Sequence, residues 1–349
     1  MGCRGPRKVA AARGQQQQSV RVGGVDALLP TGLRGFDWLL GGGLAIGEVT
    51  EIFGAPGVGK SQLCMLASAS QALFTGGTTL YIDISGQFSA QRLVALSNAT
   101  VMREKLPLDV LKARLAQRLW VLATTNLPDL LCELDALDEL LRRRCEPGGV
   151  LGGARPAGAS GAGAHAAGAP TVPPRAAAPP GASAPVQTPS VFAEGERARH
   201  LRLVVVDSVF SACCGERVDE PETLAGGQLA RLGARLRDLA VRHRLAVLVT
   251  NAARFQSTFV RHGEAAPPRD AYPPRPALGV AWLSMAHVRV LLHKKPPDGR
   301  TVVQLLQHGL TARAVPQTEA VLARVYVTFG PGGAVTGEAR LSERNGRRW

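Results

Sequence analysis

Short apolar runs alternate with helical patterns along most of this chain. Runs rich in β-branched residues, typical of buried strands, stand at 48–53, 78–84, 118–125, 201–208 and 245–251. Apolar residues at helical spacing predict helices over 33–40, 61–74, 88–98, 127–144 and 222–243. This alternation predicts an α/β fold with a mostly parallel central sheet flanked by helices. Further strands expected at 286–293, 301–307 and 321–329 extend the sheet edge as β hairpins.

Three segments carry no such pattern. Residues 1–27 combine basic and Gln-rich sequence, residues 146–198 are rich in Gly, Ala, Pro and Ser, and residues 337–349 are basic. Such compositions bury too little apolar surface to fold. We therefore expect a disordered arm, a disordered insertion and a frayed tail around one core at 28–336.

Composition narrows the class of partner. The formal net charge is +14 and the pI is near 10.4, which favours a polyanion, nucleic acid before a membrane surface; a solubilising surface charge is the alternative. No stretch approaches the roughly 18 apolar residues of a membrane span, so no membrane role is expected. The six cysteines show no C-x-x-C spacing and no secretory signal precedes them, which predicts reduced intracellular thiols.

The octapeptide GAPGVGKS at 54–61 is a complete phosphate loop, preceded by a predicted strand and followed by a predicted helix. Its glycines let backbone N–H groups close around the β-phosphate, Lys60 reaches the β- and γ-phosphates, and the Ser61 hydroxyl ligates Mg²⁺. The expected contacts of ATP·Mg²⁺ in this segment are Gly54, Ala55, Pro56, Gly57, Val58, Gly59, Lys60, Ser61 and Gln62.

A second acidic element fits the same site. The strand LVVVD ends in Asp207, the form of a Walker B acid that holds Mg²⁺ through water. Alone, such an Asp is often only a cap at the end of a strand. Without the insertion, the distance from the phosphate loop leaves room for two further strand-helix units, as in a larger ATPase rather than a small nucleotide kinase.

Several blocks together resemble the RecA-type recombinase family. They are residues 29–65, 80–96, 201–209, 245–251 and 276–292, and the pattern around the phosphate loop is most similar to the D-type paralogue of the eukaryotic strand-exchange recombinase. The resemblance implies a RecA-like P-loop ATPase core. It also implies that Arg92 lies beside the adenine base; a solvated helix residue is the alternative.

Two departures from the family pattern bear on catalysis. Where active recombinases carry Glu after the second strand, this chain has Ser85, which does not accept a proton usefully at neutral pH. Where they carry T-N-Q, with Gln sensing the γ-phosphate, this chain reads Thr250-Asn251-Ala252. We expect ATP to be bound and hydrolysed weakly, and we assign no catalytic residue.

The segment 252–276 interleaves arginines with aromatic residues, a combination that single-strand binders use for phosphates and bases. It matches the family's second DNA-binding loop, and the expected DNA contacts are Arg254, Phe255, Phe259 and Arg261; a Pro-rich loop without contacts is the alternative. Arg231, Arg235 and Arg242 fall near one helix face, which is more typical of a solvated surface than of a DNA contact.

The resemblance also sets expectations about partners. It implies hetero-oligomers with other recombinase paralogues, and because no F-x-x-A segment precedes the core, long homo-filaments are not favoured. D-type paralogues begin with a small helical domain, whereas no helical pattern stands before residue 28 here. Docking of a partner through such a domain is therefore in doubt; a truncated gene model is the alternative.

The expected function is that of a nuclear, ATP-binding paralogue acting on single-stranded or branched DNA in homologous recombination repair of double-strand breaks and interstrand crosslinks. Two alternatives remain. One is an active DNA-dependent ATPase or strand-exchange enzyme. The other is a P-loop ATPase of another branch, such as a hexameric helicase or a clock-type ATPase.

Overall fold

A computed structural model describes the parts of the chain from which the fold is built. The described residues are 21–22, 25–26, 28–98, 107–143, 200–213, 224–254, 274–295, 300–307, 323–329 and 335–340. None of the helices in these described ranges combines the length and the hydrophobicity that a membrane span requires.

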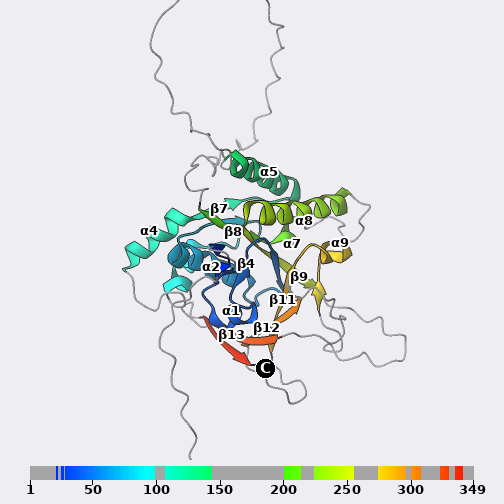
Figure 1. Ribbon diagram of the computed structural model, residues 1–349. Helices are drawn as coiled ribbons and strands as arrows, with labels where there is room; N and C mark the ends of the chain where they lie inside the picture. Colours follow the sequence, from blue (N-terminus) through cyan, green and yellow to red (C-terminus); the bar gives the residue numbers. More distant parts are fainter. Residues whose placement is uncertain are drawn as a thin grey trace, which may run out of the picture.

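A ten-stranded sheet forms the centre of the molecule (Figure 1). Its strands are β5 (Val49–Gly54), β6 (Thr78–Asp83), β7 (Leu119–Ala123), β8 (Leu201–Asp207), β9 (Ala246–Arg254), β10 (Arg275–Pro276), β11 (Val288–Lys295), β12 (Arg300–Gln307), β13 (Ala323–Phe329) and β14 (Val335–Arg340). The spatial order is β14-β13-β12-β11-β5-β9-β8-β6-β7, with β10 paired to β9. Strands β11 to β7 in this order are parallel, whereas β12, β13 and β14 add antiparallel hairpins.

Helices cover both faces of this sheet (Figure 1). They are α1 (Arg34–Leu39), α2 (Lys60–Ser70) with its π-helical extension η1 (Gln71–Thr75), α3 (Ala90–Leu96), α4 (Leu108–Arg118), α5 (Leu127–Arg143), α7 (Val209–Ala212), α8 (Leu224–His243) and α9 (Gly279–Leu283). The remaining strands are short: β1 (Arg21–Val22), β2 (Val25–Asp26), β3 (Leu28–Leu29) and β4 (Leu44–Ala45).

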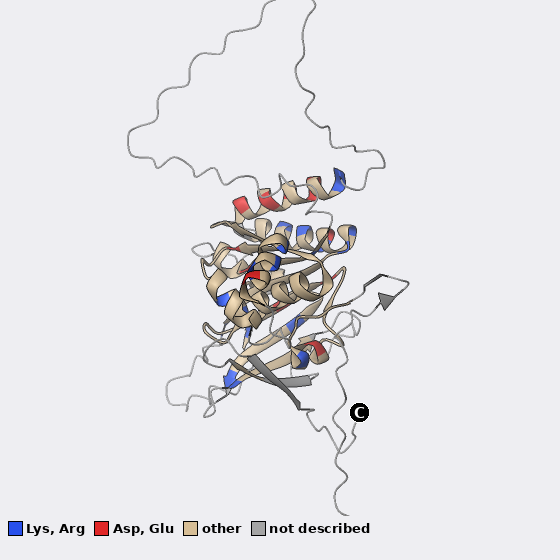
Figure 2. Cartoon of the chain, turned by 90° about the vertical axis from the view of Figure 1, so that its left-hand side faces the viewer, with Lys and Arg blue, Asp and Glu red and all other residues tan. Residues whose placement is uncertain are grey.

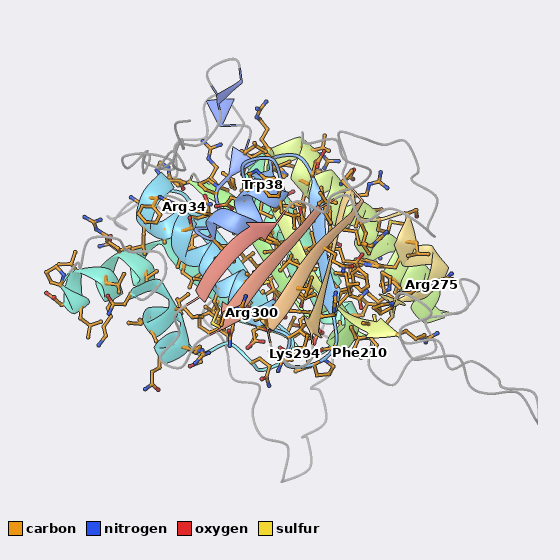
Figure 3. All side chains as sticks on the ribbon, turned by 90° about the horizontal axis from the view of Figure 1, so that it is seen from below. Arg34, Trp38, Phe210, Arg275, Lys294 and Arg300 are labelled. Atoms are coloured by element: carbon orange, nitrogen blue, oxygen red, sulfur yellow. The ribbon has the colours of Figure 1, made fainter. Side chains whose placement is uncertain are left out.

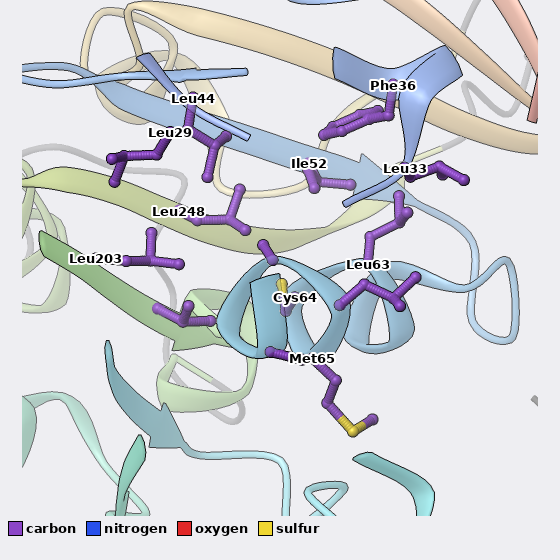
Figure 4. Close-up of a cluster of buried hydrophobic side chains, with 14 of the residues drawn as sticks. Leu29, Leu33, Phe36, Leu44, Ile52, Leu63, Cys64, Met65, Leu203 and Leu248 are labelled. Atoms are coloured by element: carbon purple, nitrogen blue, oxygen red, sulfur yellow. The ribbon is translucent and has the colours of Figure 1, made fainter. Parts of the chain in front are cut away.

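The two-residue period of a strand explains the two helical layers. In β8, Leu203 and Val205 face a core shared with α1, α2, α3 and α4, while Val204 and Val206 face a second core shared with α5, α8 and α9. Figure 4 shows the first core, where Leu63 and Cys64 of α2 pack beneath β5, β8 and β9. A strand buried on both faces reads as a continuous apolar run, which is why β8 could be recognised in the sequence.

The predicted fold class is confirmed, including the hairpins at the edge of the sheet. Helix α4 and strand β14 were not anticipated. Only Leu111 and Leu115 of α4 are fully buried, so its apolar stripe is narrow, and β14 has the polar sequence VTGEAR. Strand β14 also crosses the expected boundary at residue 336.

The arginines of α8 have partners on the neighbouring helix. Arg231 and Arg235 contact Asp135 of α5 at 3.2 and 2.5 Å, and Arg242 contacts Asp138 at 3.2 Å. In Figure 2, acidic residues of α5 lie above basic residues of α8. These arginines therefore join two helices while their side chains stay partly exposed, as expected of a solvated helix surface.

Candidate nucleotide site

The carboxyl ends of the parallel strands bring the predicted site residues to one edge of the sheet. Gly54, at the end of β5, lies in register with Ala252 of β9 on one side and with Leu292 of β11 on the other. In the same way Asp83 of β6 pairs with Asp207 of β8. Open α/β sheets bind ligands at this edge, so the topology supports the predicted location.

The phosphate loop needs glycine at two places for different reasons. A Cβ on Gly54 would lie 2.3 Å from the carbonyl oxygen of Leu292, because β11 approaches β5 closely there. Gly59 has a φ of 102° and is the N-cap of α2 without a side-chain cap bond. Helix α2 therefore begins at Lys60 with backbone N–H groups that a phosphate is suited to accept.

The side chains of Lys60 and Thr301 hydrogen-bond carbonyl oxygens of the phosphate loop. The Lys60 ammonium donates to the carbonyl oxygens of Gly54 at 2.8 Å and Ala55 at 3.0 Å. Burial lowers the pKa of Lys60, and the charge of Asp207 partly opposes this shift. The Thr301 hydroxyl of β12 donates to the Val58 carbonyl at 3.1 Å. The middle of the phosphate loop is thus hydrogen-bonded to strand β12.

Asp207 is held by two hydroxyl groups. It is 2% exposed, its Oδ2 accepts from the Tyr81 hydroxyl at 2.7 Å, and its Oδ1 accepts from the Thr250 hydroxyl. Burial and the neighbouring acidic groups raise the pKa of Tyr81, so its hydroxyl remains a donor. A carboxylate has about four lone-pair positions. Asp207 therefore keeps capacity for a water ligand of Mg²⁺.

The Ser61 hydroxyl and the Asp207 carboxylate suit a Mg²⁺ ion bound together with ATP. Magnesium prefers oxygen ligands and keeps several of its waters, which suits the Ser61 hydroxyl in the first turn of α2 and a water-mediated contact with Asp207. Cys64, one turn further along α2, does not compete, because burial and Asp207 raise the pKa of its thiol well above the usual value.

Ser85 lies just after β6, beside Asp83 and Asp207. Its backbone N–H donates to the Asp207 carbonyl at 3.2 Å, and its hydroxyl is 3.2 Å from Oδ1 of Asp83. Asp83 is the nearest carboxylate in sequence, but it also accepts from the backbone N–H groups of Gln87 and Phe88 at 3.2 and 2.9 Å. These three accepted bonds hold the Asp83 carboxylate in the turn after β6.

Ala252, Arg92 and Gln62 were also singled out in the sequence, Ala252 as a departure from the family pattern and the other two as nucleotide contacts. Ala252 ends in a methyl group beside Gly54 and cannot hydrogen-bond a phosphate. Arg92 is half-buried in the first turn of α3, which contacts α2, and its backbone N–H donates to the cap Ser89. Gln62 follows Ser61 in α2, and its buried Oε1 has no hydrogen-bond partner among the described residues.

Of the expected DNA contacts, only Arg254 belongs to the described residues. Phe255, Phe259 and Arg261 lie outside them. Arg254 ends β9 and is directly opposite Arg275 of β10, and both side chains are exposed. Figure 3 labels Arg275 together with the exposed Phe210, Lys294 and Arg300; the positions of all four in their strands and helix put them at the carboxyl edge.

The sequence interpretation missed the groups that orient the site. Tyr81 and Thr250 were not assigned to Asp207, and Glu51, a charged residue inside the apolar strand before the phosphate loop, was not singled out. An isolated Glu in a run such as VTEIFG is a usable signal, because a buried charge needs partners.

Comparisons with known proteins show what this chain is similar to. Residues 26–119 match the Rad51 family model. The chain is 38% identical over 114 residues to DNA repair protein RAD51 homolog 4 of Mus musculus, covering 33% of this chain and 32% of that protein. It is 34% identical over 122 residues to RAD51 homolog 2 of Arabidopsis thaliana, covering 34% and 33%. The matches thus span about a third of these relatives.

The solved structure of the RadB recombinase is similar over a wider range. The two align with a TM-score of 0.51 and 19% identity, covering 88% of this chain and 99% of RadB. At that identity the likeness shows the fold. The predicted resemblance to RecA-type recombinases is confirmed by the sequence matches and the fold together.

Proposed function

We propose that this chain, a relative of the RecA-type recombinases, binds ATP·Mg²⁺ as a structural ligand and acts on DNA in homologous recombination repair. One observation carries the proposal. A complete phosphate loop and a well-held Asp207 share the site with Ser85 and Ala252, which supply neither a base nor a γ-phosphate sensor. Such a site favours retention of the nucleotide over its rapid hydrolysis.

The like-charged pair Arg254 and Arg275 supports a contact with nucleic acid. The two exposed arginines stand directly opposite each other in the ladder, so their positive charges add at one place and attract an anion. Phosphates of single-stranded DNA supply such an anion, and the aromatic residues Phe255 and Phe259 of the intervening segment offer faces for base stacking. Arg261 completes the proposed contact, and Lys294 and Arg300 extend the positive edge.

The proposal extends to partners and location. Proteins named as RAD51 homologs and RadB are described as DNA repair or recombination proteins. By that likeness we assign this chain to hetero-oligomers with other recombinase paralogues, in the nucleus, serving repair of double-strand breaks and interstrand crosslinks. Long homo-filaments are not part of the proposal.

Nucleotide binding tests the central claim. Lys60→Ala should abolish binding of a fluorescent ATP analogue, whereas Lys112→Ala, an exposed lysine of α4, should leave it unchanged. Turnover by the unmodified protein should remain well below about one per second even with DNA, the lower end of ordinary enzyme rates. Faster DNA-stimulated turnover would support the active ATPase instead.

DNA binding and assembly are tested separately. Single-strand affinity should fall steeply with salt, as expected when arginines displace counterions from phosphates. A pull-down from native extract, with and without ATP, should recover other recombinase-family subunits. If it recovers none while ATP binding is intact, the assignment to a paralogue complex is wrong.

A further inference from the structure

The hairpin of β11 and β12 lies against the phosphate loop at two points. At the start of the loop, a Cβ on Gly54 would lie 2.3 Å from the Leu292 carbonyl oxygen of β11. At its middle, the Thr301 hydroxyl of β12 donates to the Val58 carbonyl at 3.1 Å. Thr301 is 2% exposed and Val58 is 3% exposed, so this hydrogen bond is shielded from water. The hairpin is therefore in direct contact with the nucleotide site.

The position of Thr301 is fixed by the sheet. Its backbone pairs with Lys294 of β11 on one side and with Val327 of β13 on the other. The tip of the phosphate loop, in contrast, is exposed at Pro56 and Gly57. The Thr301 hydroxyl thus connects a strand that is paired on both sides to a loop whose tip is open to solvent.

This hydrogen bond sets the orientation of the peptide that joins Val58 to Gly59. In a trans peptide the C=O and N–H groups point in opposite directions. Because the Val58 carbonyl is held toward β12, the Gly59 N–H points away from β12. That side of the loop is where the β-phosphate is expected, so the N–H is placed to donate to it.

The same peptide is easily reversed when it is not held. Gly59 has a φ of 102°, and glycine adopts positive and negative φ about equally readily. A half-turn of the peptide would give Gly59 a negative φ and would exchange the places of the Val58 carbonyl and the Gly59 N–H. A carbonyl oxygen would then face the phosphate, and the two negative groups would repel each other.

We propose that Thr301 is a positioning residue of the nucleotide site, whose hydroxyl holds the Gly59 N–H toward the β-phosphate before the nucleotide binds. The proposal rests on the proposed function, in which this loop binds ATP·Mg²⁺. Lys60 is not suited to the same role, because the ammonium that holds Gly54 and Ala55 is also the group that reaches the phosphates. A loop that is already ordered binds more tightly, since less conformational entropy is lost on binding.

Thr301→Val tests the proposal because it removes the hydroxyl and keeps a β-branched side chain in the strand. Isothermal titration calorimetry should show weaker binding of both ADP·Mg²⁺ and ATP·Mg²⁺. We expect both affinities to fall by the same factor, about 2- to 10-fold, the usual net contribution of one hydrogen bond. The factor is shared because both nucleotides carry the β-phosphate. Thr301→Ser keeps the hydroxyl and should bind both nucleotides as the unmodified protein does.

Thr79→Val is the matched control. Thr79 of β6 is also fully buried, but its hydroxyl has no hydrogen-bond partner among the described residues. The same change of side chain there should leave both nucleotide affinities unchanged. Urea unfolding without nucleotide establishes that each variant is folded under the conditions of the titration.

The nucleotide affinities separate failure of this inference from failure of the proposed function. If the unmodified protein binds neither nucleotide, the proposed function is wrong and the role of Thr301 falls with it. If the unmodified protein binds both and folded Thr301→Val binds them equally well, the positioning role alone is wrong. An equal loss of affinity in Thr301→Ser or in Thr79→Val would also overturn it, because the Thr301 hydroxyl would then not be the cause.

Discussion

Asp83 of β6 and Asp207 of β8 are paired in register but accept hydrogen bonds from different groups. Asp207 accepts from the hydroxyl groups of Tyr81 and Thr250, whereas Asp83 accepts from Ser85, Gln87 and Phe88 and stabilises its own turn. At the residue scale, the chemistry of the site is therefore set by hydrogen-bond partners. An additional free carboxylate is what the site lacks for catalysis.

Ser85→Glu supplies that carboxylate. We expect ATP turnover to rise by about 10²-fold, the lower end of the range for a positioned general base, because Ala252 still provides no γ-phosphate contact. The Ser85 backbone is already fixed on Asp207, so the new side chain starts from a defined place at the site. Steady-state phosphate release, compared with the unmodified protein at saturating ATP, measures the change.

Ser85→Gln is the control for this gain. It has the same length and also loses the hydroxyl bond to Asp83, but it carries no base. Equal rates in the Glu and Gln variants, with ATP binding intact in both, would contradict the assignment of position 85.

At the element scale, α5 and α8 are joined by charge as well as by leucines. Asp138, whose side chain is 5% exposed, contacts Arg142 at 2.8 Å, Arg242 at 3.2 Å and His243 at 2.7 Å. Burial alone raises the pKa of Asp138, but the hydrogen bond with His243 and the charges of Arg142 and Arg242 outweigh it. The pKa therefore lies below its ordinary 3.8.

Asp138→Asn should lower the free energy of unfolding by about 1–3 kcal/mol at neutral pH. This is less than the about 3–5 kcal/mol lost when a fully buried pair is broken, because the arginines are partly solvated. Since the folded pKa is depressed, the stabilisation is present above the unfolded pKa and is lost as the pH falls through the folded value. The difference between variant and unmodified protein should shrink below about pH 4, as measured by urea unfolding.

The exposed pair of Asp238 and Arg242 provides the control. Asp238 is 57% exposed and lies 3.4 Å from the same arginine, so Asp238→Asn should change stability by no more than about 0.5 kcal/mol. If both substitutions have equal effects, burial of Asp138 is not the reason for its contribution.

The periodic spacing of apolar residues was enough to predict most helices and strands, and the glycine-rich motif was enough to predict a phosphate site. Strands such as β8 are apolar on both faces, and GAPGVGKS combines a complete motif with correct flanks. The sequence could not reveal pairings set by strand order. That Glu51 meets Arg289, or that Tyr81 meets Asp207, depends on β5 lying beside β11 and on β6 lying beside β8. Helix α4 was missed because its buried stripe is too narrow for periodicity to detect.

At the scale of the whole molecule, one connection is far longer than the others. Helix α5 ends at Arg143 and β8 starts at Leu201, and the Gly/Ala/Pro-rich sequence between them lies outside the described residues. In the sheet β8 lies between β6 and β9, so the core on both sides of the connection is continuous. The fold therefore has no need of the intervening sequence, which remains a predicted insertion.

Shortening residues 144–199 to about a quarter of their length, as a Gly/Ser linker, tests this prediction. Closure of a flexible loop costs about 0.6 kcal/mol for each doubling, so the free energy of unfolding should rise by about 1 kcal/mol. ATP affinity should stay unchanged, because the site is built from β5, β6, β8 and β9. A variant with the same segment scrambled at constant length should match the unmodified protein in both respects. If scrambling or shortening destabilises the core instead, the segment packs against it and is part of the fold.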